Sequence, residues 1–236
     1  MRINKYLSEC GVCSRREADR LVEQGLVLIN GQRAVSGSQA EETDVVTVRG
    51  KVISRKEEKT YLKLYKPRGI VCTADQREKK NLIAYLNYPE RVTYAGRLDR
   101  DSEGLLILTD DGDLINGMMR ARENHEKEYI VTVDKPVTDE FLEKMRKGVF
   151  LKELEVTTRP CKVEAVDKVT FRIVLTQGLN RQIRRMCQAC GRKVQTLKRI
   201  RVVNVRLDDM KAGDCLPLTE EEKKELFRRV RVKRNG

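Results

Sequence analysis

The stretch GRLDRDSEGLLILTDDG, Gly96 to Gly112, places a compact apolar run among carboxylates in an otherwise basic chain. Residues 105–108 are all apolar, which predicts a buried strand. Asp110, Asp111 and Gly112 then supply residue types that are typical of a turn. The sequence therefore predicts a strand that ends in a turn, with these two carboxylates in solvent.

Asp99, within the same stretch, has a different local setting. Gly96 and Arg97 precede it, and this combination permits a constrained loop at the mouth of a sheet. Residue types alone leave a structural alternative open, because loop aspartates commonly bond to backbone amides or pair with arginine. Asp101 and Glu103 are expected to be ordinary loop charges or part of a surface network with Arg100.

Segments with strand-like patterns lie on both sides of this stretch. Branched and aromatic residues predict strands over residues 61–66, 104–109, 127–133, 161–166, 170–176 and 199–207. Helices are predicted over residues 139–147, 181–190 and 220–230, the last after a capping box. Because several strands follow one another without a regular intervening helix, the fold class is predicted to be α+β, with a mixed, mainly antiparallel sheet.

Charge and composition narrow the class of partner. The 236 residues carry 49 Lys and Arg against 36 Asp and Glu, a formal charge of +13. This excess indicates a polyanionic partner, with nucleic acid first and an anionic membrane surface second. No apolar run approaches the roughly 18 residues of a membrane span, and the first residues lack a signal-peptide pattern, so we expect a cytoplasmic protein.

The cysteines and the histidine point away from metal chemistry. Seven scattered cysteines in a chain without an export signal favour reduced thiols over a disulfide framework. Cys10–Cys13 and Cys187–Cys190 have CxxC spacing, but their separation along the chain argues against a shared zinc site. His125 is the sole histidine, which excludes a histidine pair or triad, and it is expected to be exposed or locally bonded in a loop.

The amino-terminal residues predict a small α/β module. Residues 3–10 carry apolar side chains at helical spacing, and a second helix starts at the Ser14–Glu17 capping box. Apolar runs around Asn30–Gly31 and around Arg49–Gly50 predict two hairpins. The highly charged segment 54–60 predicts a linker, which gives one domain over residues 1–53 and a second over residues 61–236.

Three arginines of the second helix, Arg15, Arg16 and Arg20, form a charged cluster that is compatible with RNA binding or with an ordinary solvated face. The segments RINKYL, GVCSRREADRLVEQG and VLINGQ resemble the RNA-binding fold named after ribosomal protein S-four. This resemblance covers about the first fifty residues. It implies that Arg15, Arg16, Arg20 and Arg33 contact RNA phosphates, which supply affinity but little sequence information.

The larger domain carries a second, more extended resemblance. KPRGI, GRLDRDSEGLLILTDDG, EKEYIVTV and QGLNRQIRRM occur in that order. They resemble the successive motifs of RNA pseudouridine synthases of the RsuA and RluF branch, and the combination is more specific than any one fragment. The resemblance implies isomerisation of uridine to pseudouridine, which requires no cofactor, group donor or metal. The sequence also lacks the GxGxxG, P-loop and HExxH signatures.

The resemblance assigns catalytic roles to three residues. Asp99 matches the essential aspartate, and a carboxylate nucleophile suits a reaction that breaks and remakes a bond at a sugar. Arg184 is expected to pair with this carboxylate and to favour its ionised form. Tyr129 matches the pocket tyrosine that stacks on the flipped uracil and helps to remove the ring proton. Without the resemblance, Tyr129 reads as simple core or edge packing.

Further residues are expected to bind the substrate. Arg97 would occupy the gap left by the flipped nucleotide, and Ile183 would pack near the target base. Arg181 and Arg185 are expected to bind substrate, Arg185 through phosphate. The alternative for Arg181, Arg184 and Arg185 is that they contact only phosphate or solvent. Lys66, in the first motif, is included in the substrate-binding set, with shaping and support of the pocket as its expected contribution.

Residues 180–206 contain nine basic and no acidic residues, which predicts an RNA-facing wall. The tail RRVRVKRN, residues 228–235, repeats the bias and suggests a phosphate-binding extension. HEKEYIVTVDKP and VLTQGLNRQIRRMC look closest to the RluF type, which favours a uridine in 23S, large-subunit ribosomal RNA. Transfer RNA and 16S ribosomal RNA remain alternative substrates, and a catalytically silent ribosome-assembly factor is the alternative from another class.

Overall fold

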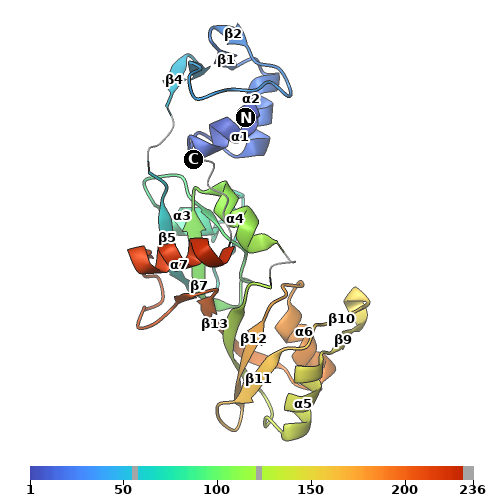
Figure 1. Ribbon diagram of the computed structural model, residues 1–236. Helices are drawn as coiled ribbons and strands as arrows, with labels where there is room; N and C mark the ends of the chain where they lie inside the picture. The colour runs from blue at the N-terminus through green and yellow to red at the C-terminus, as the bar shows by residue number, and fades with distance from the viewer. Residues whose placement is uncertain (55–57, 121–123, 231–236) are drawn as a thin grey trace. The chain divides into compact units, whose positions relative to one another are not determined.

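The computed structural model describes residues 1–54, 58–120 and 124–230, which divide into two compact units (Figure 1). The first unit contains Met1–Thr60 and two short segments, Tyr88–Thr93 and Thr109–Gly112. The second contains Tyr61–Asn87, Tyr94–Leu108 and the chain from Asp113 onward. The linker predicted over residues 54–60 and the basic tail over residues 228–235 fall partly outside the described residues.

Two helices and a small sheet make up most of the first unit. Helices α1 (Ile3–Glu9) and α2 (Arg15–Glu23) precede an antiparallel sheet of order β2-β1-β3-β4. Its strands are β1 (Val27–Ile29), β2 (Gln32–Arg33), β3 (Val46–Val48) and β4 (Lys51–Ile53). The predicted helices and hairpins are confirmed. Ser14 caps α2 by accepting a hydrogen bond from Glu17 N at 3.2 Å.

A mixed sheet organises the second unit, with the order β11-β12-β8-β13-β7-β5-β15. Strand β6 pairs with β7, and β14 pairs with β13. The pairing of β7 with β13 is parallel, whereas β8 pairs antiparallel with both β12 and β13. The predicted α+β class with a mixed, mainly antiparallel sheet is confirmed. The strands are β5 (Tyr61–Lys66), β6 (Thr93–Tyr94), β7 (Glu103–Thr109), β8 (Lys127–Val133), β11 (Lys162–Ala165), β12 (Thr170–Leu175), β13 (Val194–Val202), β14 (Val205–Arg206) and β15 (Cys215–Pro217).

Helices cover this sheet through two apolar clusters. In the first cluster α5 (Asp139–Lys147) and α6 (Gln182–Ala189) pack against β8, β11 and β12. In the second, α4 (Gly112–Met119) and α7 (Glu220–Val230) pack against β7 (Figure 1). The remaining elements are α3 (Leu82–Leu86), β9 (Phe150–Leu151), η2 (Lys152–Leu154) and β10 (Val156–Thr157). In the described part of the chain, no helix has the length and apolar character needed to cross a membrane.

Several local predictions were incomplete or wrong. The predicted helices over residues 139–147 and 220–230 are confirmed, but α3 and α4 were not predicted, and Gly112 begins α4 instead of ending a turn. Asp110 is not a solvated carboxylate. It is 8 % exposed, and its Oδ1 accepts a hydrogen bond from Thr60 N at 2.8 Å. The strand predicted over residues 199–207 begins at Val194 and divides at Val203, where φ is 56°.

Candidate active site

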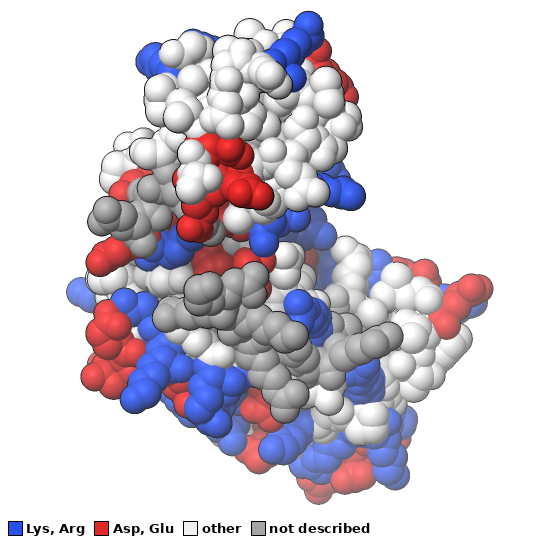
Figure 2. Space-filling view, turned by 45° about the horizontal axis from the view of Figure 1, so that its top comes forward, with Lys and Arg blue, Asp and Glu red and all other residues white. Residues whose placement is uncertain are grey.

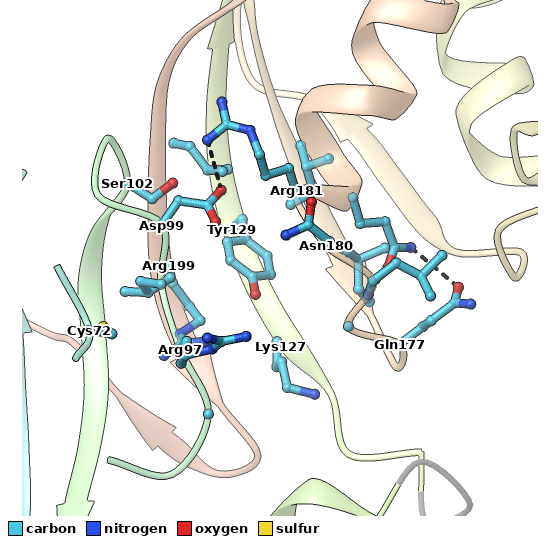
Figure 3. A pocket seen from close by; sticks show the side chains of 18 of the residues that line it. Cys72, Arg97, Asp99, Ser102, Lys127, Tyr129, Gln177, Asn180, Arg181 and Arg199 are labelled. Carbon is cyan, nitrogen blue, oxygen red and sulfur yellow. Dashed lines mark hydrogen bonds and ion pairs between the residues drawn. The ribbon is translucent and has the colours of Figure 1, made fainter. Parts of the chain in front are cut away.

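A pocket of about 630 Å³ lies within the second unit. Strands β8, β12 and β13 contribute to its walls, together with the loop before β7 and the loop before α6. Figure 3 shows side chains from these segments pointing toward one another. The pocket therefore gathers parts of the chain that are separated by about a hundred residues. Its charged and aromatic lining includes Arg97, Asp99, Arg100, Lys127, Tyr129, Arg159, Arg181 and Arg199.

Asp99 lies in the loop that leads into β7. Its carbonyl oxygen accepts a hydrogen bond from Ser102 N at 3.1 Å, and the neighbouring Arg100 carbonyl accepts one from Gly69 N at 2.7 Å. Gly96, with a φ of 81°, begins the loop. The side chain of Asp99 is 29 % exposed, so the backbone is held while the carboxylate remains open to the pocket.

Two arginines from the start of α6 face this carboxylate. Arg181 Nη1 and Arg184 Nε each lie 3.8 Å from Asp99 Oδ2 (the Arg181 pair is dashed in Figure 3). Arg184 Nη2 also donates to Asp101 O at 3.1 Å and to Ser102 Oγ at 3.3 Å. Burial lowers the pKa of Arg184, and the charge of Arg181 adds to this effect. The predicted partner of Asp99 is thus in place, and Arg181 joins it.

Tyr129 and Ile183 complete the centre of the pocket. Tyr129 is half-buried on β8, opposite Ile173 on β12 and Arg199 on β13. Ile183 is 4 % exposed on α6. An aromatic ring and a branched apolar side chain in one pocket suit contact with a flat, uncharged ring.

Comparison with known proteins identifies the family of this chain. The family model described as RNA pseudouridylate synthase matches residues 60–189, and the model described as S4 domain matches residues 1–46. The chain is 48 % identical to the dual-specificity RNA pseudouridine synthase RluF of Escherichia coli K12, over 98 % of this chain and 79 % of that protein. The chain belongs to the RNA pseudouridine synthase family.

Two further relatives agree with this membership. The ribosomal large subunit pseudouridine synthase B of Bacillus subtilis is 34 % identical, over 95 % of each chain. A crystal structure of a pseudouridylate synthase superposes with a TM-score of 0.70 at 31 % identity, covering 96 % of this chain and 99 % of that one. The predicted resemblance, the enzyme class and the RNA-binding character of the first residues are thereby confirmed.

Lys66 does not reach the substrate side of this synthase pocket. Its side chain is fully buried, and Nζ donates to Pro67 O and Ile70 O at 2.8 Å each. Burial lowers the pKa of Lys66, while the nearby Cys72 and Asp99 act in the opposite direction. The ammonium group thus contacts carbonyls of the Pro67–Ile70 loop, and Lys66 is not among the residues that line the pocket. These contacts favour the expected support of the pocket over direct binding of substrate.

The structure separates the other predicted substrate-binding arginines. Arg97 lines the pocket with an exposed side chain, and Arg181 lines it beside Asp99. Arg185 turns away and does not line the pocket. It pairs with Glu153, and its Nε donates to Asn180 O at 3.0 Å. The Arg185 guanidinium, which was expected to bind phosphate, is thus paired with the carboxylate of Glu153.

The nine basic residues between 180 and 206 do not form a single RNA-facing wall. Arg201 is buried against Glu128, and Arg192 stacks over the Phe141 ring at 4.2 Å from its centroid. Arg199 is also buried, at 2 % exposure. On the face shown in Figure 2, basic and acidic side chains are interspersed instead of forming a stripe of one sign. A count of charges along the sequence could not show that some of these basic side chains are buried against other residues of the protein.

The predicted RNA-contacting arginines of the first unit lie on or beside α2. Arg15, Arg16 and Arg20 are exposed, and Arg20 pairs with Glu17 at 3.2 Å. Arg33 Nη2 donates to Glu23 O at 3.2 Å, which brings its guanidinium to the end of the same helix. All four charges therefore lie where a polyanion can approach this unit.

Sequence reasoning missed several basic groups of the pocket, among them His125, Lys127 and Arg199. His125 lines it at 8 % exposure, so the expectation of an exposed loop residue was wrong, although it was also expected to bond locally. Lys127 and Arg199 line it as well. Lys127 had a usable signal, because it lies two residues before Tyr129 on a strand and therefore shares its face. No such sequence signal existed for Arg199, because its position in the pocket depends on an irregularity of β13.

The cysteines are free thiols in the structure. Burial raises the pKa of Cys161 to about 11 and that of Cys187 to about 12, so both stay protonated near neutral pH. Among the described residues, no group of three or more His, Cys, Asp and Glu side chains could hold a metal ion.

Proposed function

We propose that this protein converts a specific uridine to pseudouridine in structured RNA, with Asp99 as the nucleophile and 23S, large-subunit ribosomal RNA as the source of the target. The observation that carries the proposal is the carboxylate of Asp99, which opens into a pocket between two guanidinium groups at 3.8 Å and beside Tyr129. The two guanidinium groups can orient the carboxylate that would act as the nucleophile.

The residues of the pocket fit the bond changes of the reaction. As the bond between N1 of uracil and C1′ of ribose breaks, its electron pair stays on the base, and an Asp99 oxygen bonds to C1′. The base then turns so that C5 bonds to C1′ while the carboxylate leaves. The proton on C5 departs last while N1, which no longer bonds to ribose, takes up a proton, and Tyr129 is the candidate to assist removal of the C5 proton. A transient sugar intermediate reached without attack by Asp99 gives the same product and is the other route.

Arg97 and Ile183 would support the flipped nucleotide. Arg97 is exposed at the pocket and can replace the extruded base in its stack, while Ile183 offers an apolar contact inside. The exposed arginines of α2 would bind phosphates of the same RNA. The choice of large-subunit RNA rests on the similarity to RluF and to synthase B, whose names state dual specificity and the large subunit.

The test is pseudouridine mapping of ribosomal and transfer RNA from cells with the wild-type protein, cells lacking it, and cells carrying Asp99→Asn. We expect one site in 23S RNA to be lost in both defective strains. Asp101→Asn is the matched control, because this exposed carboxylate of the same loop does not line the pocket. Maps that stay unchanged, while the purified protein still binds RNA, would support an assembly factor instead. Loss of a site in 16S or transfer RNA would reassign the substrate.

A further inference from the structure

Arg199 is a buried guanidinium without a carboxylate partner. Its side chain lines the pocket at 2 % exposure, and its Nε donates to Leu105 O at 2.7 Å. Its Nη2 is buried without a hydrogen-bond partner, and no ion pair to Arg199 is formed within the described ranges. A buried charge is costly unless it is paired, so this arrangement indicates a partner that the protein itself does not supply.

The same strand shows how a buried arginine is otherwise neutralised. Arg201 Nε donates to Glu128 Oε2 at 2.6 Å, and its Nη2 donates to Glu126 Oε2 at 2.9 Å. A register irregularity of β13 between Arg199 and Arg201 places Arg199 opposite Tyr129 and Arg201 opposite Glu128. Bulges of this kind re-aim side chains and are frequent next to active sites. The irregularity therefore directs Arg201 toward the carboxylates of Glu128 and Glu126, and Arg199 toward the pocket.

Lys127 adds a second cation to this part of the pocket. It lies two residues before Tyr129 on β8, and Figure 3 shows Lys127, Arg199 and Arg97 on one side of the pocket. Its Nζ donates to His125 O at 3.3 Å, a long and neutral contact. Burial lowers the pKa of Lys127, and the charge of Arg199 lowers it further. Two neighbouring cations without a carboxylate between them favour an acceptor that carries negative charge.

We propose that Arg199 and Lys127 hold a carbonyl oxygen of the flipped uracil ring and stabilise the negative charge that this ring carries while it is detached from ribose. The inference rests on the proposed function. When the N1–C1′ bond breaks, the electron pair left on N1 spreads over the ring to O2 and O4. Hydrogen bonds from cations to such an oxygen strengthen as its charge develops, which lowers the barrier to detachment.

A base oxygen fits this place better than a phosphate does. Phosphates are strongly hydrated and stay on the outside of a flipped nucleotide, where exposed arginines such as Arg181, with 44 % of its side chain exposed, can meet them. Arg199 lies deeper, beside the buried side chains of Leu197 and Leu175. Buried cations beside apolar side chains suit a flat ring that is neutral before the reaction and anionic during it.

The test is a chemical double-mutant cycle between the enzyme and the base. An RNA stem-loop that contains the mapped uridine is made with uridine, 2-thiouridine or 4-thiouridine at that position. Sulfur accepts hydrogen bonds weakly, so in the wild-type enzyme we expect one of the two thio-substitutions to slow single-turnover conversion by about 10-fold to 100-fold. In Arg199→Gln the uridine substrate is already slow, and the same thio-substitution should have little additional effect.

Arg201→Gln is the matched control, because it removes a buried guanidinium of the same strand from the opposite face. It should lower the melting temperature and leave both thio-effects as in wild type. Equal thio-effects in wild type and Arg199→Gln would overturn the proposal. If Arg199→Gln also binds RNA more weakly while its thio-effects stay unchanged, Arg199 contacts a phosphate instead. If Arg199→Gln does not fold, Arg199→Lys is used. If neither variant folds, the wild-type enzyme alone still tests the proposal. It is overturned if wild type converts both thio-substrates at the same single-turnover rate as the uridine substrate. Absence of pseudouridine formation by wild type would refute the proposed function instead.

Discussion

Arg184 holds Asp99 both directly and through its loop: Arg184 Nε lies 3.8 Å from Asp99 Oδ2, while Nη2 of the same guanidinium donates to Asp101 O and Ser102 Oγ. A single side chain thus supplies positive charge to the carboxylate and fixes the backbone that carries it. Lysine can supply the charge but not this fork of donors.

Arg184→Lys should therefore slow pseudouridine formation in a single turnover by about 100-fold, because the carboxylate loses its orientation while its charge partner remains. RNA affinity should change little, since the side chain is only 14 % exposed. Arg185→Lys is the control, because Arg185 starts from the same helix but pairs with Glu153 away from the pocket. A loss of rate in the Arg184 variant that is matched by the control would contradict this role.

The ion pairs of Arg201 with the buried Glu128 and the partly exposed Glu126 should contribute to the stability of the sheet around β8. The Arg201 and Glu128 side chains are 11 % and 5 % exposed. Arg201→Leu leaves the buried Glu128 carboxylate with only the partly exposed Arg172, whose Nη1 lies 3.3 Å from Glu128 Oε1, so the free energy of unfolding should fall by about 2 kcal/mol in urea denaturation. Adding Glu128→Leu should restore part of this loss, because the buried, poorly compensated charge is removed as well. A double variant less stable than the sum of both single losses would speak against the pair.

Much of the fold was predictable because short-range rules decide it. The Ser14 cap, the two hairpins and the Thr219–Glu222 capping box each depend on residues within a few positions of one another. The parallel pairing of β7 with β13 joins Glu103 and Gly104 to Lys198 and Arg199. Sequence spacing alone could not predict this pairing, because it depends on contacts across nearly a hundred residues.

The grouping of site residues that lie in the motifs was predictable from the sequence. The positions of residues that depend on packing were not. Asp99, Arg184 and Tyr129 come together as the resemblance implied. Lys66 and Arg199 show the limits, since a basic residue type does not reveal whether its partner is substrate or backbone. Lys66 is enclosed by its own loop, and the position of Arg199 depends on one irregularity of β13.

Tyr65 should make part of the stability depend on alkaline pH. Burial, together with the hydrogen bond from its hydroxyl to Glu103 Oε2 at 3.0 Å, raises the pKa of Tyr65 to about 12 from the ordinary 10. The protonated phenol is thus favoured in the native state, so its contribution is full below pH 10 and is lost as the pH rises to 12. The advantage of wild type over Tyr65→Phe in urea denaturation should shrink by about 2 kcal/mol across this range. Parallel pH curves for the two proteins would show that Tyr65 is not the group responsible.

Gly104 should be intolerant of any side chain, because of both its conformation and its neighbour. Its φ is +108°, and a Cβ would lie 2.2 Å from Arg199 O and 2.7 Å from Arg199 N. These are backbone atoms in the parallel pairing of β7 with β13, so relief requires the strands to separate. Gly104→Ala should lower the free energy of unfolding by more than about 3 kcal/mol, and conversion should slow in any protein that remains folded, because Arg199 shifts with its backbone.

Gly191→Ala separates the effect of a positive φ from the effect of a close backbone contact. Gly191 also has a positive φ, +73°, but a Cβ there meets nothing within 4 Å. It should cost only about 1 kcal/mol, the strain of the left-handed conformation alone, and should leave the rate of conversion unchanged. Equal losses of stability in the two alanine variants would mean that β7 and β13 can move apart freely. The pocket would then not depend on the close contact between Gly104 and Arg199.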